Sequence, residues 1–225
     1  MLVVYENNDF LIADKPHEVP TVPLKSQDME GTLLGMVAAQ YPDILCVRGI
    51  NPWEYGTVHR LDTATAGLVI FARTQEAYEY LCSIQRRHLM EKTYTACVEP
   101  SDRLKGFEKP DADTFEIISY FRSYGPKSKE VRAIQDIRRA DSPVLYRTKV
   151  KDLGDNIMEC TITRGFRHQI RVHLAWAGIP IVGDPLYGKQ YGQKGTLELD
   201  CRRISFPLED GNHFTFTKPS GRISS

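Results

Sequence analysis

The apolar run Leu68–Ala72 constrains the fold of this chain most strongly. It is continuous and contains β-branched residues, so it predicts a strand buried on both faces. The polar residues that lead into it include His59, Arg60 and Asp62. A carboxylate flanked by cationic side chains at the entry to a core strand is held on a rigid element, as active-site acids often are. The stretch Tyr55–Arg73 is therefore the candidate functional centre of the chain.

Each polar residue of this stretch also has an ordinary structural explanation. Asp62 is followed by Thr and Gly residues and fits a turn, because Asp readily bonds nearby backbone amides. Arg60 alone would be a surface cation, and His59 alone a loop histidine with satisfied ring nitrogens. Only the run as a whole favours a functional site over a turn.

Length and composition place the chain among ordinary globular proteins. Its 225 residues suffice for one large domain or two small ones, with 41% hydrophobic and 26% charged residues. The sequence has no apolar stretch of about 18 residues, and its first residues lack the basic and apolar regions of a secretory signal. The five scattered cysteines form no CxxC pair, which favours small buried side chains in a reducing cytosol over disulfides or a zinc site. We expect a cytoplasmic protein that does not span a membrane.

The net charge gives no direct indication of a nucleic-acid partner. The chain has 29 basic and 29 acidic residues, whereas a strongly basic balance would have favoured nucleic acid. The segment Arg122–Lys151 is an exception, with nine Lys or Arg residues and three acidic ones. Such a segment is either a solvated loop or a surface that contacts phosphates, and both interpretations stay open.

Hydrophobic periodicity predicts a chain rich in strands with three helices. The expected strands are Leu2–Tyr5, Phe10–Ala13, Leu68–Ala72, a strand that begins at Lys92, Asp113–Arg122, Val144–Lys151, Ile157–Thr163, Leu197–Leu208 and His213–Thr217. The expected helices are Thr32–Tyr41, a helix from Thr74 to about His88, and a short helix that carries Ile170, Leu174 and Ala177. Thr residues cap the first two helices, and Gly178 ends the third.

The second helix should turn one apolar face to the core. Ala77, Leu81 and Ile84 have helical spacing, and Tyr80 borders them. Arg86 and Arg87 lie at its end, where cations interact favourably with the helix dipole, so they need no other partner.

The residues HRLDTATAGL, from His59 to Leu68, resemble the motif His-Arg-Leu-Asp-x-x-Thr-Ser-Gly-Leu of the RluA family of pseudouridine synthases. Ala66 stands where that family has Ser. The resemblance implies that Asp62 is the catalytic carboxylate.

A second motif, KTYTA, is similar to the family's Lys-x-Tyr-x-Ala. By this resemblance Tyr94 stacks on the target base and is a candidate proton-transfer group. A tyrosine in a strand is also common for packing reasons alone.

A third segment, HQIRVHLAWAGIPIVGDPLYG, is similar to the family's Gly-Arg-Thr-His-Gln-Ile-Arg-x-His-Leu and the residues that follow it. The family's arginine directly after the glycine pairs with the catalytic Asp, but this chain has Phe166 there. Arg167, one position later, is the predicted partner of Asp62, with Arg164 and Arg171 as alternatives.

The resemblance implies an α+β fold, with a mixed and largely antiparallel sheet, flanking helices and a central cleft. It covers roughly residues 2–208, and we expect one catalytic domain, 1–225, without a separate N-terminal RNA-binding module. The implied reaction breaks the C1′–N1 bond of uridine, turns the uracil and rejoins it through C5. This isomerisation needs no cofactor.

The implied substrate is a loop or single-stranded uridine of ribosomal or transfer RNA, bound by a monomeric enzyme. Extrusion of a base costs least in loops, and an aromatic side chain can hold it by stacking. The motif residues expected to bind the substrate are His59, Arg60, Thr65, His168, Gln169 and Arg171.

Two other functions fit parts of the sequence. A catalytically inactive RNA-binding protein on the same scaffold would explain the displaced arginine. A small-molecule glycosidase normally uses two placed carboxylates, and only Asp62 lies in a motif. A metal site is not expected, because His168 and His173 are five residues apart and lack an acidic third ligand.

Overall fold

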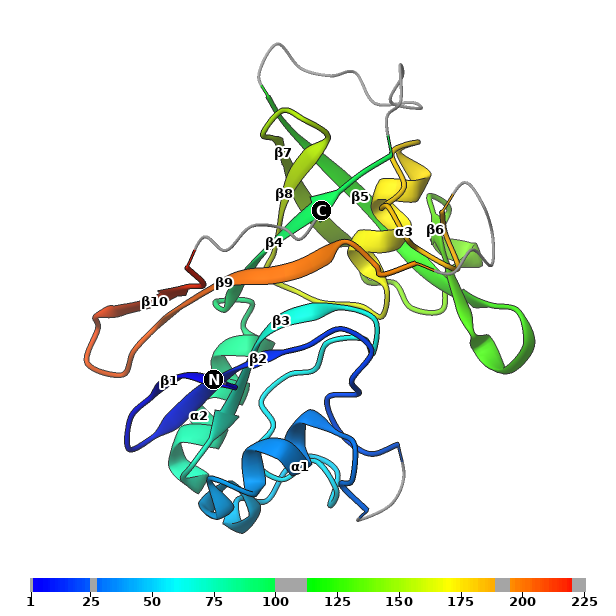
Figure 1. The fold of residues 1–225 in the computed structure, drawn as a ribbon. Coiled ribbons are helices and arrows are strands. Elements are labelled where there is room, and N and C mark those ends of the chain that lie inside the picture. Colours follow the sequence, from blue (N-terminus) through cyan, green and yellow to red (C-terminus); the bar gives the residue numbers. More distant parts are fainter. Residues whose placement is uncertain (1, 25–27, 100–112, 189–194, 220–225) are drawn as a thin grey trace. The chain divides into compact units, whose positions relative to one another are not determined.

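The computed structural model describes residues 2–24, 28–99, 113–188 and 195–219 (Figure 1). These residues belong to two compact units, one of Met1–Thr93 with Cys201–Ser225 and one of Tyr94–Asp200. Strands β4 and β9 each contain a boundary between the units. The described part of the chain has no helix that is long and apolar enough to cross a membrane.

The elements bear out the predicted α+β class. The strands are β1 (Val3–Glu6), β2 (Phe10–Lys15), β3 (Ala66–Ala72), β4 (Glu91–Cys97), β5 (Thr114–Tyr124), β6 (Glu130–Ile134), β7 (Tyr146–Asp152), β8 (Ile157–Ile162), β9 (Leu199–Pro207) and β10 (His213–Thr217). The helices are α1 (Leu33–Ala38), α2 (Gln75–Arg86) and α3 (Gln169–Trp176), with short 3-10 turns η1 (Pro42–Cys46), η2 (Pro126–Ser128) and η3 (Ile137–Arg139).

Strand β3 is the centre of the first unit. All seven of its residues are buried, as the apolar run predicted. Strand β2 pairs with it in antiparallel register, from Phe10 opposite Ala72 to Lys15 opposite Gly67. Strand β1 pairs with β2, and α1 packs on these strands with η1 to form one hydrophobic core.

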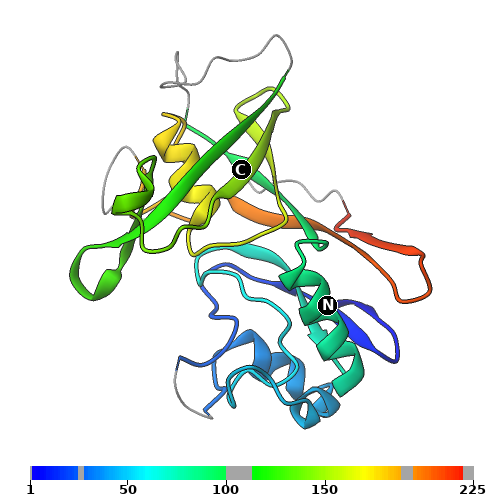
Figure 2. The same ribbon diagram turned by 180° about the vertical axis from the view of Figure 1, so that it is seen from behind.

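Both helices of the first unit begin at the predicted caps. The Thr32 hydroxyl accepts a hydrogen bond from the Gly35 amide, and the Thr74 hydroxyl accepts one from the Ala77 amide. Helix α2 contacts β3 and lies on the near side of β1–β3 in Figure 2. The prediction for its buried face was partly wrong, because Tyr78 is buried with Leu81 and Ile84 and the Tyr80 ring is only half-buried.

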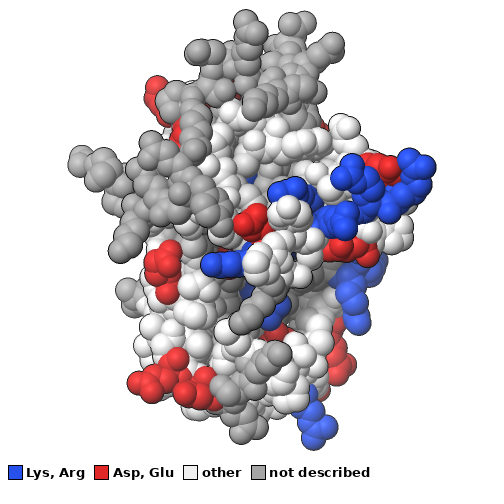
Figure 3. All heavy atoms as spheres, turned by 90° about the vertical axis from the view of Figure 1, so that its right-hand side faces the viewer, with Lys and Arg blue, Asp and Glu red and all other residues white. Residues whose placement is uncertain are grey.

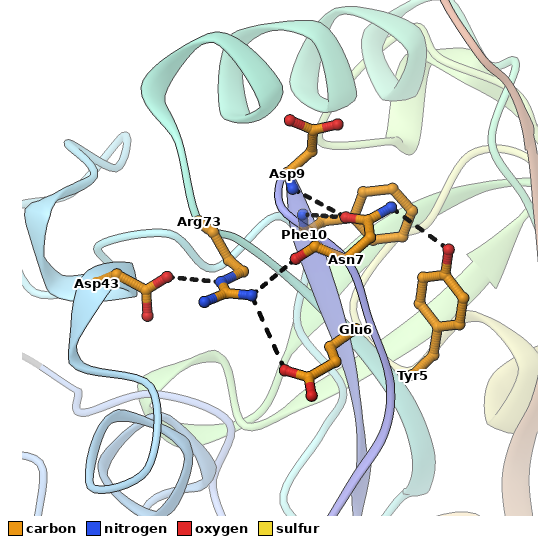
Figure 4. Close-up of polar contacts among 7 residues, drawn as sticks. All are labelled: Tyr5, Glu6, Asn7, Asp9, Phe10, Asp43 and Arg73. Carbon is orange, nitrogen blue, oxygen red and sulfur yellow. Dashed lines mark hydrogen bonds and ion pairs between the residues drawn. The ribbon is translucent and has the colours of Figure 1, made fainter.

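Arg73 fastens the end of β3 to two neighbouring segments (Figure 4). Its Nε donates to the Asp43 carboxylate at 2.6 Å, and its Nη1 donates to the Asn7 carbonyl at 2.8 Å. Nη1 also lies 3.8 Å from the Glu6 carboxylate. The guanidinium therefore holds η1 and the β1–β2 turn against the core strand.

The second unit contains the antiparallel strands β5, β6, β7 and β8. Strand β6 lies inside the basic segment that the sequence left open as a loop. Its five residues alternate weakly between apolar and charged, and pairing with β5 gives them their structure. The stacked rings of Phe121 and Phe166, 4.8 Å apart, join this hairpin to the segment before α3.

Helix α3 is buried more completely than predicted. One apolar face was expected, but all six residues from Gln169 to Leu174 are buried, polar ones included. It ends at Gly178, which has a φ of +89°, and the amides of Gly178 and Ile179 bond the carbonyls of Ala175 and Leu174. This is a Schellman motif, and it confirms the predicted glycine stop.

The turn at Gly183 permits a test of the packing in this unit. Gly183 has a φ of +73°, and a Cβ there would lie 1.9 Å from the Thr196 carbonyl oxygen. Gly154 has a φ of +84° with no atom within 4 Å of an added Cβ. We expect Gly154→Ala to lower the free energy of unfolding by about 1 kcal/mol and Gly183→Ala to lower it by more than about 2 kcal/mol. Equal losses in urea denaturation would contradict the described packing.

Candidate active site

Asp62 lies in the short loop that enters β3. The amide of Thr65 donates to the Asp62 carbonyl at 3.0 Å, so Asp62 begins a backbone turn. Arg60, Asp62 and Thr65 all belong to this loop, and Thr65 is buried.

The buried ammonium group of Lys15 bonds to this loop. The side chain of Lys15, at the end of β2, is fully buried. Its Nζ donates to the carbonyls of Pro16 at 2.9 Å, Val19 at 2.6 Å and Thr63 at 2.9 Å. Burial lowers the pKa of Lys15 to about 8, although the carboxylates of Glu18 and Asp62 oppose this shift.

Two further side chains fix the backbone beside Asp62. The Thr21 hydroxyl donates to the Leu61 carbonyl at 2.9 Å and accepts the Leu61 amide at 3.1 Å. The His17 Nδ1 contacts the Ala64 carbonyl at 2.9 Å. The residues on both sides of Asp62 are therefore held in place. Such support preorganises a functional side chain.

Lys15 was not among the residues that the sequence predicted for the site. The lysine follows a run of buried residues in β2. A cation at the end of a buried strand requires buried hydrogen-bond acceptors. This requirement could have identified Lys15 from the sequence.

The histidine and arginine of the first motif have different surroundings. His59 is buried, and its Nε2 accepts the Ile70 amide at 3.4 Å. Burial and the charge of Lys92 lower its pKa well below the usual value, so the ring is neutral. The Arg60 side chain is 60% exposed and forms a 2.9 Å ion pair with Glu54. Arg60 can therefore reach a ligand in solvent, whereas His59 packs beneath the loop.

Tyr94 lies in β4, where the predicted strand is confirmed. It is buried, as are Lys92 and Thr93 before it. Three consecutive buried residues mean that both faces of the strand are covered. Burial lowers the pKa of Lys92.

The third motif surrounds the N-terminus of α3. The ring of Phe166, at the position where the family's arginine was expected, stacks on Phe121 and lies 5.1 Å from Tyr146. Arg167 is exposed, and its Nη2 donates to the carbonyls of Ser128 and Glu130. Phe166 is thus a packing residue, and Arg167 reaches toward the turn of the β5–β6 hairpin.

Arg171 is one turn further along α3 and is buried. It donates through Nε and Nη2 to the two carboxylate oxygens of Asp184, each at 2.8 Å. Asp184 also accepts the amides of Leu186 and Tyr187. Burial would raise the pKa of Asp184, but the Arg171 guanidinium and these amides outweigh it and lower the pKa. These contacts make the turn around Asp184 a structural element of the second unit.

The two histidines of this motif bond hydroxyl groups. His168 contacts the Tyr187 hydroxyl through Nδ1 at 2.8 Å. His173 is buried between Ser119 and Thr148, whose hydroxyls lie 3.0 Å from Nε2 and 2.8 Å from Nδ1. Burial lowers the pKa of His173 to about 3, so its ring is neutral.

Gln169 completes this polar network. Its Nε2 donates to the Arg147 carbonyl at 2.9 Å and to the Thr148 hydroxyl at 3.2 Å. No cluster of three or more His, Cys, Asp or Glu side chains suited to a metal ion occurs within the described ranges.

Apart from Tyr94 in β4, the predicted site residues form two groups, each within one unit. The first-motif residues share the loop before β3, and the third-motif residues share the start of α3. Sequence reasoning missed Lys15 and Thr21, which hold the first group, and Tyr187 and Asp184, which hold the second.

Comparisons with known proteins bear on this arrangement. Residues 9–176 match the family model described as RNA pseudouridylate synthase. The chain is 31% identical over 186 residues to ribosomal large subunit pseudouridine synthase D of Xanthomonas campestris, with 83% of this chain and 51% of that protein covered. It is 28% identical over 187 residues to the uncharacterized RNA pseudouridine synthase YlyB of Bacillus subtilis, with 83% and 57% covered. The chain thus spans about half the length of these curated relatives.

Two solved structures share the fold. Human RNA pseudouridylate synthase domain containing 1 superimposes with a TM-score of 0.69 at 21% identity, covering 97% of this chain and 82% of the other. Human RNA pseudouridylate synthase domain containing 4 gives 0.66 at 17% identity, covering 98% and 88%. Because the family model matches most of the sequence, and the resemblance to RluA-type motifs agrees with it, the chain belongs to the RNA pseudouridylate synthase family.

Proposed function

We propose that this protein isomerises uridines in structured RNA to pseudouridine. The observation that carries the proposal is the loop of the first motif, where Asp62 sits between backbone segments fixed by Lys15 and Thr21. The names of the relatives support the same reaction. We expect a cytoplasmic monomer that needs no cofactor.

Asp62 is proposed as the catalytic carboxylate. It either attacks the ribose or base as a nucleophile or removes a proton from the sugar. The C1′–N1 bond breaks, the uracil turns and a C1′–C5 bond forms. C5 loses its proton to water and N1 gains one proton from water, so atoms and electrons balance without an oxidant or a second substrate.

Tyr94 is proposed to stack on the extruded uracil and to transfer a proton. Its position on a strand covered on both faces would give the ring one fixed orientation. Stacking on an aromatic ring stabilises an unstacked base by about 1–3 kcal/mol, which would offset much of the cost of extrusion.

The cation that orients Asp62 is proposed to be Arg167. Its exposed guanidinium uses one nitrogen for backbone carbonyls and keeps other N–H donors. Arg171 is the alternative, although its Nε and Nη2 already hold Asp184. Arg60, His59, Thr65, His168 and Gln169 are proposed to shape the substrate site, with Arg60 on phosphate.

The substrate is proposed to be a loop uridine of ribosomal or transfer RNA. The name of the Xanthomonas relative makes large-subunit ribosomal RNA the first RNA to test. Mapping pseudouridines in RNA from cells with and without the gene would identify the position.

Asp62→Asn should abolish isomerisation and leave RNA affinity within about tenfold, because one carboxylate contributes little to phosphate contacts. Release of tritium from C5 of labelled uridine in RNA measures turnover. Asp9→Asn, an exposed acid of the same unit, should keep full activity. Turnover by Asp62→Asn would exclude Asp62 as the catalyst, and inactivity of the wild-type protein that binds RNA would favour an inactive RNA-binding protein.

Arg167→Gln should slow turnover by about 10²-fold or more if its charge orients Asp62, since arginine holds a carboxylate through a planar fork. Arg86→Gln, at the exposed end of α2, is the comparison and should change the rate little. Turnover retained in Arg167→Gln would transfer the role to Arg171 or Arg164.

Lys15→Met should lower the free energy of unfolding at pH 7 by about 2–4 kcal/mol, because buried carbonyls lose their donor. The pKa of Lys15 is about 8 in the fold and 10.5 ordinarily. Between these values the unfolded chain binds more protons, so the stability of the wild type relative to Lys15→Met should rise with pH. Urea denaturation from pH 7 to pH 10 measures this, with exposed Lys149→Met as the control. A pH-independent difference would contradict the described burial.

A further inference from the structure

The β5–β6 hairpin carries an exposed basic face. Residues 122–139 contain six Lys or Arg residues and two acidic ones. The strands alternate between faces: Phe121 and Val131 are buried, whereas Arg122 and Arg132 are exposed. The hairpin of Figure 1 projects toward the face drawn in Figure 3, where Lys and Arg side chains gather.

Two arginines lie directly opposite each other on this face. Arg122 of β5 is the register partner of Arg132 of β6. Like charges in opposed positions on neighbouring strands are destabilising. Neither arginine forms an ion pair within the described part of the chain, whereas the nearby Asp136 binds Arg138 through both carboxylate oxygens. Arg122 helps to lower the pKa of the Asp141 carboxylate, after the Ser123 hydrogen bonds, so one acidic side chain offsets part of the charge of the pair and an external anion would offset the rest.

An aromatic ring accompanies the arginines. The guanidinium carbon of Arg132 lies 3.3 Å from the ring centre of Tyr124, which is 46% exposed. Tyr124 lies on the same face as Arg122, two residues along β5. A guanidinium on an aromatic face keeps its N–H edge available for phosphate. Basic side chains interleaved with aromatic ones are typical of surfaces that bind single-stranded RNA.

The segment that begins α3 holds the hairpin in place. Phe166 stacks on Phe121 at the base of the hairpin, and Arg167 donates to the carbonyls of Ser128 and Glu130 near its turn. The basic face is therefore presented by a supported element, so little ordering is needed when a ligand binds.

We propose that the outer face of this hairpin, Arg122, Tyr124 and Arg132, binds the phosphate backbone of the substrate RNA. The inference rests on the proposed function, since it assigns a surface to the RNA of that reaction. Two opposed guanidiniums fit consecutive phosphates of one strand, and Tyr124 offers a ring to a neighbouring base. An acidic protein surface is the other polyanion to be distinguished.

The test compares two double variants that remove equal charge. Arg122→Gln with Arg132→Gln changes the hairpin, and Arg86→Gln with Arg87→Gln changes the exposed end of α2. The probe is a fluorescently labelled stem-loop RNA with uridines in its loop, titrated by anisotropy from about 50 to 200 mM salt. The hairpin variant should bind about tenfold or more weakly at low salt. Its slope of log affinity against log salt should decrease by about 1.5, since each phosphate contact contributes roughly 0.7–0.9.

The outcomes distinguish a failure of the proposed RNA-binding surface from a failure of the proposed reaction. Equal weakening in both double variants, or an unchanged slope in the hairpin variant, would overturn the proposed surface. Arg122→Lys with Arg132→Lys should keep most of the slope, and loss of the slope there would contradict a charge contact. Wild-type protein that binds through the hairpin without releasing tritium from C5 would overturn only the proposed reaction. A wild type that binds an acidic peptide but not the stem-loop would overturn the RNA assignment.

Discussion

The buried ammonium of Lys15 is the interaction on which the candidate catalytic loop depends. An ammonium has three N–H donors. Lys15 directs them at the nearby carbonyls of Pro16 and Val19 and at the distant carbonyl of Thr63, and so joins two segments of the chain. Leaving any of these carbonyls without a donor costs about 1–3 kcal/mol, so the loop has few alternative conformations. A carboxylate held on such a loop does not need to be ordered by its substrate.

The buried pair of Arg171 and Asp184 has the equivalent role in the second unit. Burying two charges costs several kcal/mol per ion unless hydrogen bonds satisfy them. Here both carboxylate oxygens and two backbone amides take part. The pair therefore fixes the turn after α3 relative to the helix, and Tyr187 extends this network to His168 and to the Val131 amide. Polar contacts therefore stabilise the third motif both at the start of α3 and at the turn that follows the helix.

The sequence predicted most elements because their apolar periodicity was strong. Strand β3 and the caps at Thr32 and Thr74 needed no tertiary information. Strand β6 was missed because pairing with β5, rather than its own composition, defines it. The sequence shows that Phe166 departs from the family's motif. It does not show that the Phe166 ring stacks on Phe121.

The sequence identified the candidate site residues but not the contacts that hold them. The motifs identified Asp62, Tyr94 and the arginines near α3 as candidate site residues and indicated the segment that carries each. The contacts of Lys15 join residues 48 positions apart, and no local pattern specifies such a partner. For the same reason the sequence could not say that Arg167 reaches the hairpin while Arg171 binds Asp184.

The first unit is discontinuous in the chain, and this affects the order in which it can fold. Residues 201–219 supply most of β9, all of β10, the Phe206 and Phe214 rings that pack on Phe10, and the Lys218 ammonium that pairs with Asp14. During synthesis, β1–β3 emerge long before these partners. The second unit is continuous and complete before them, so it can fold first while the earlier segment waits with exposed aromatic surface. This order differs from the usual one, in which the N-terminal part folds first, because Phe10 lacks the Phe206 and Phe214 rings until those residues have been synthesised.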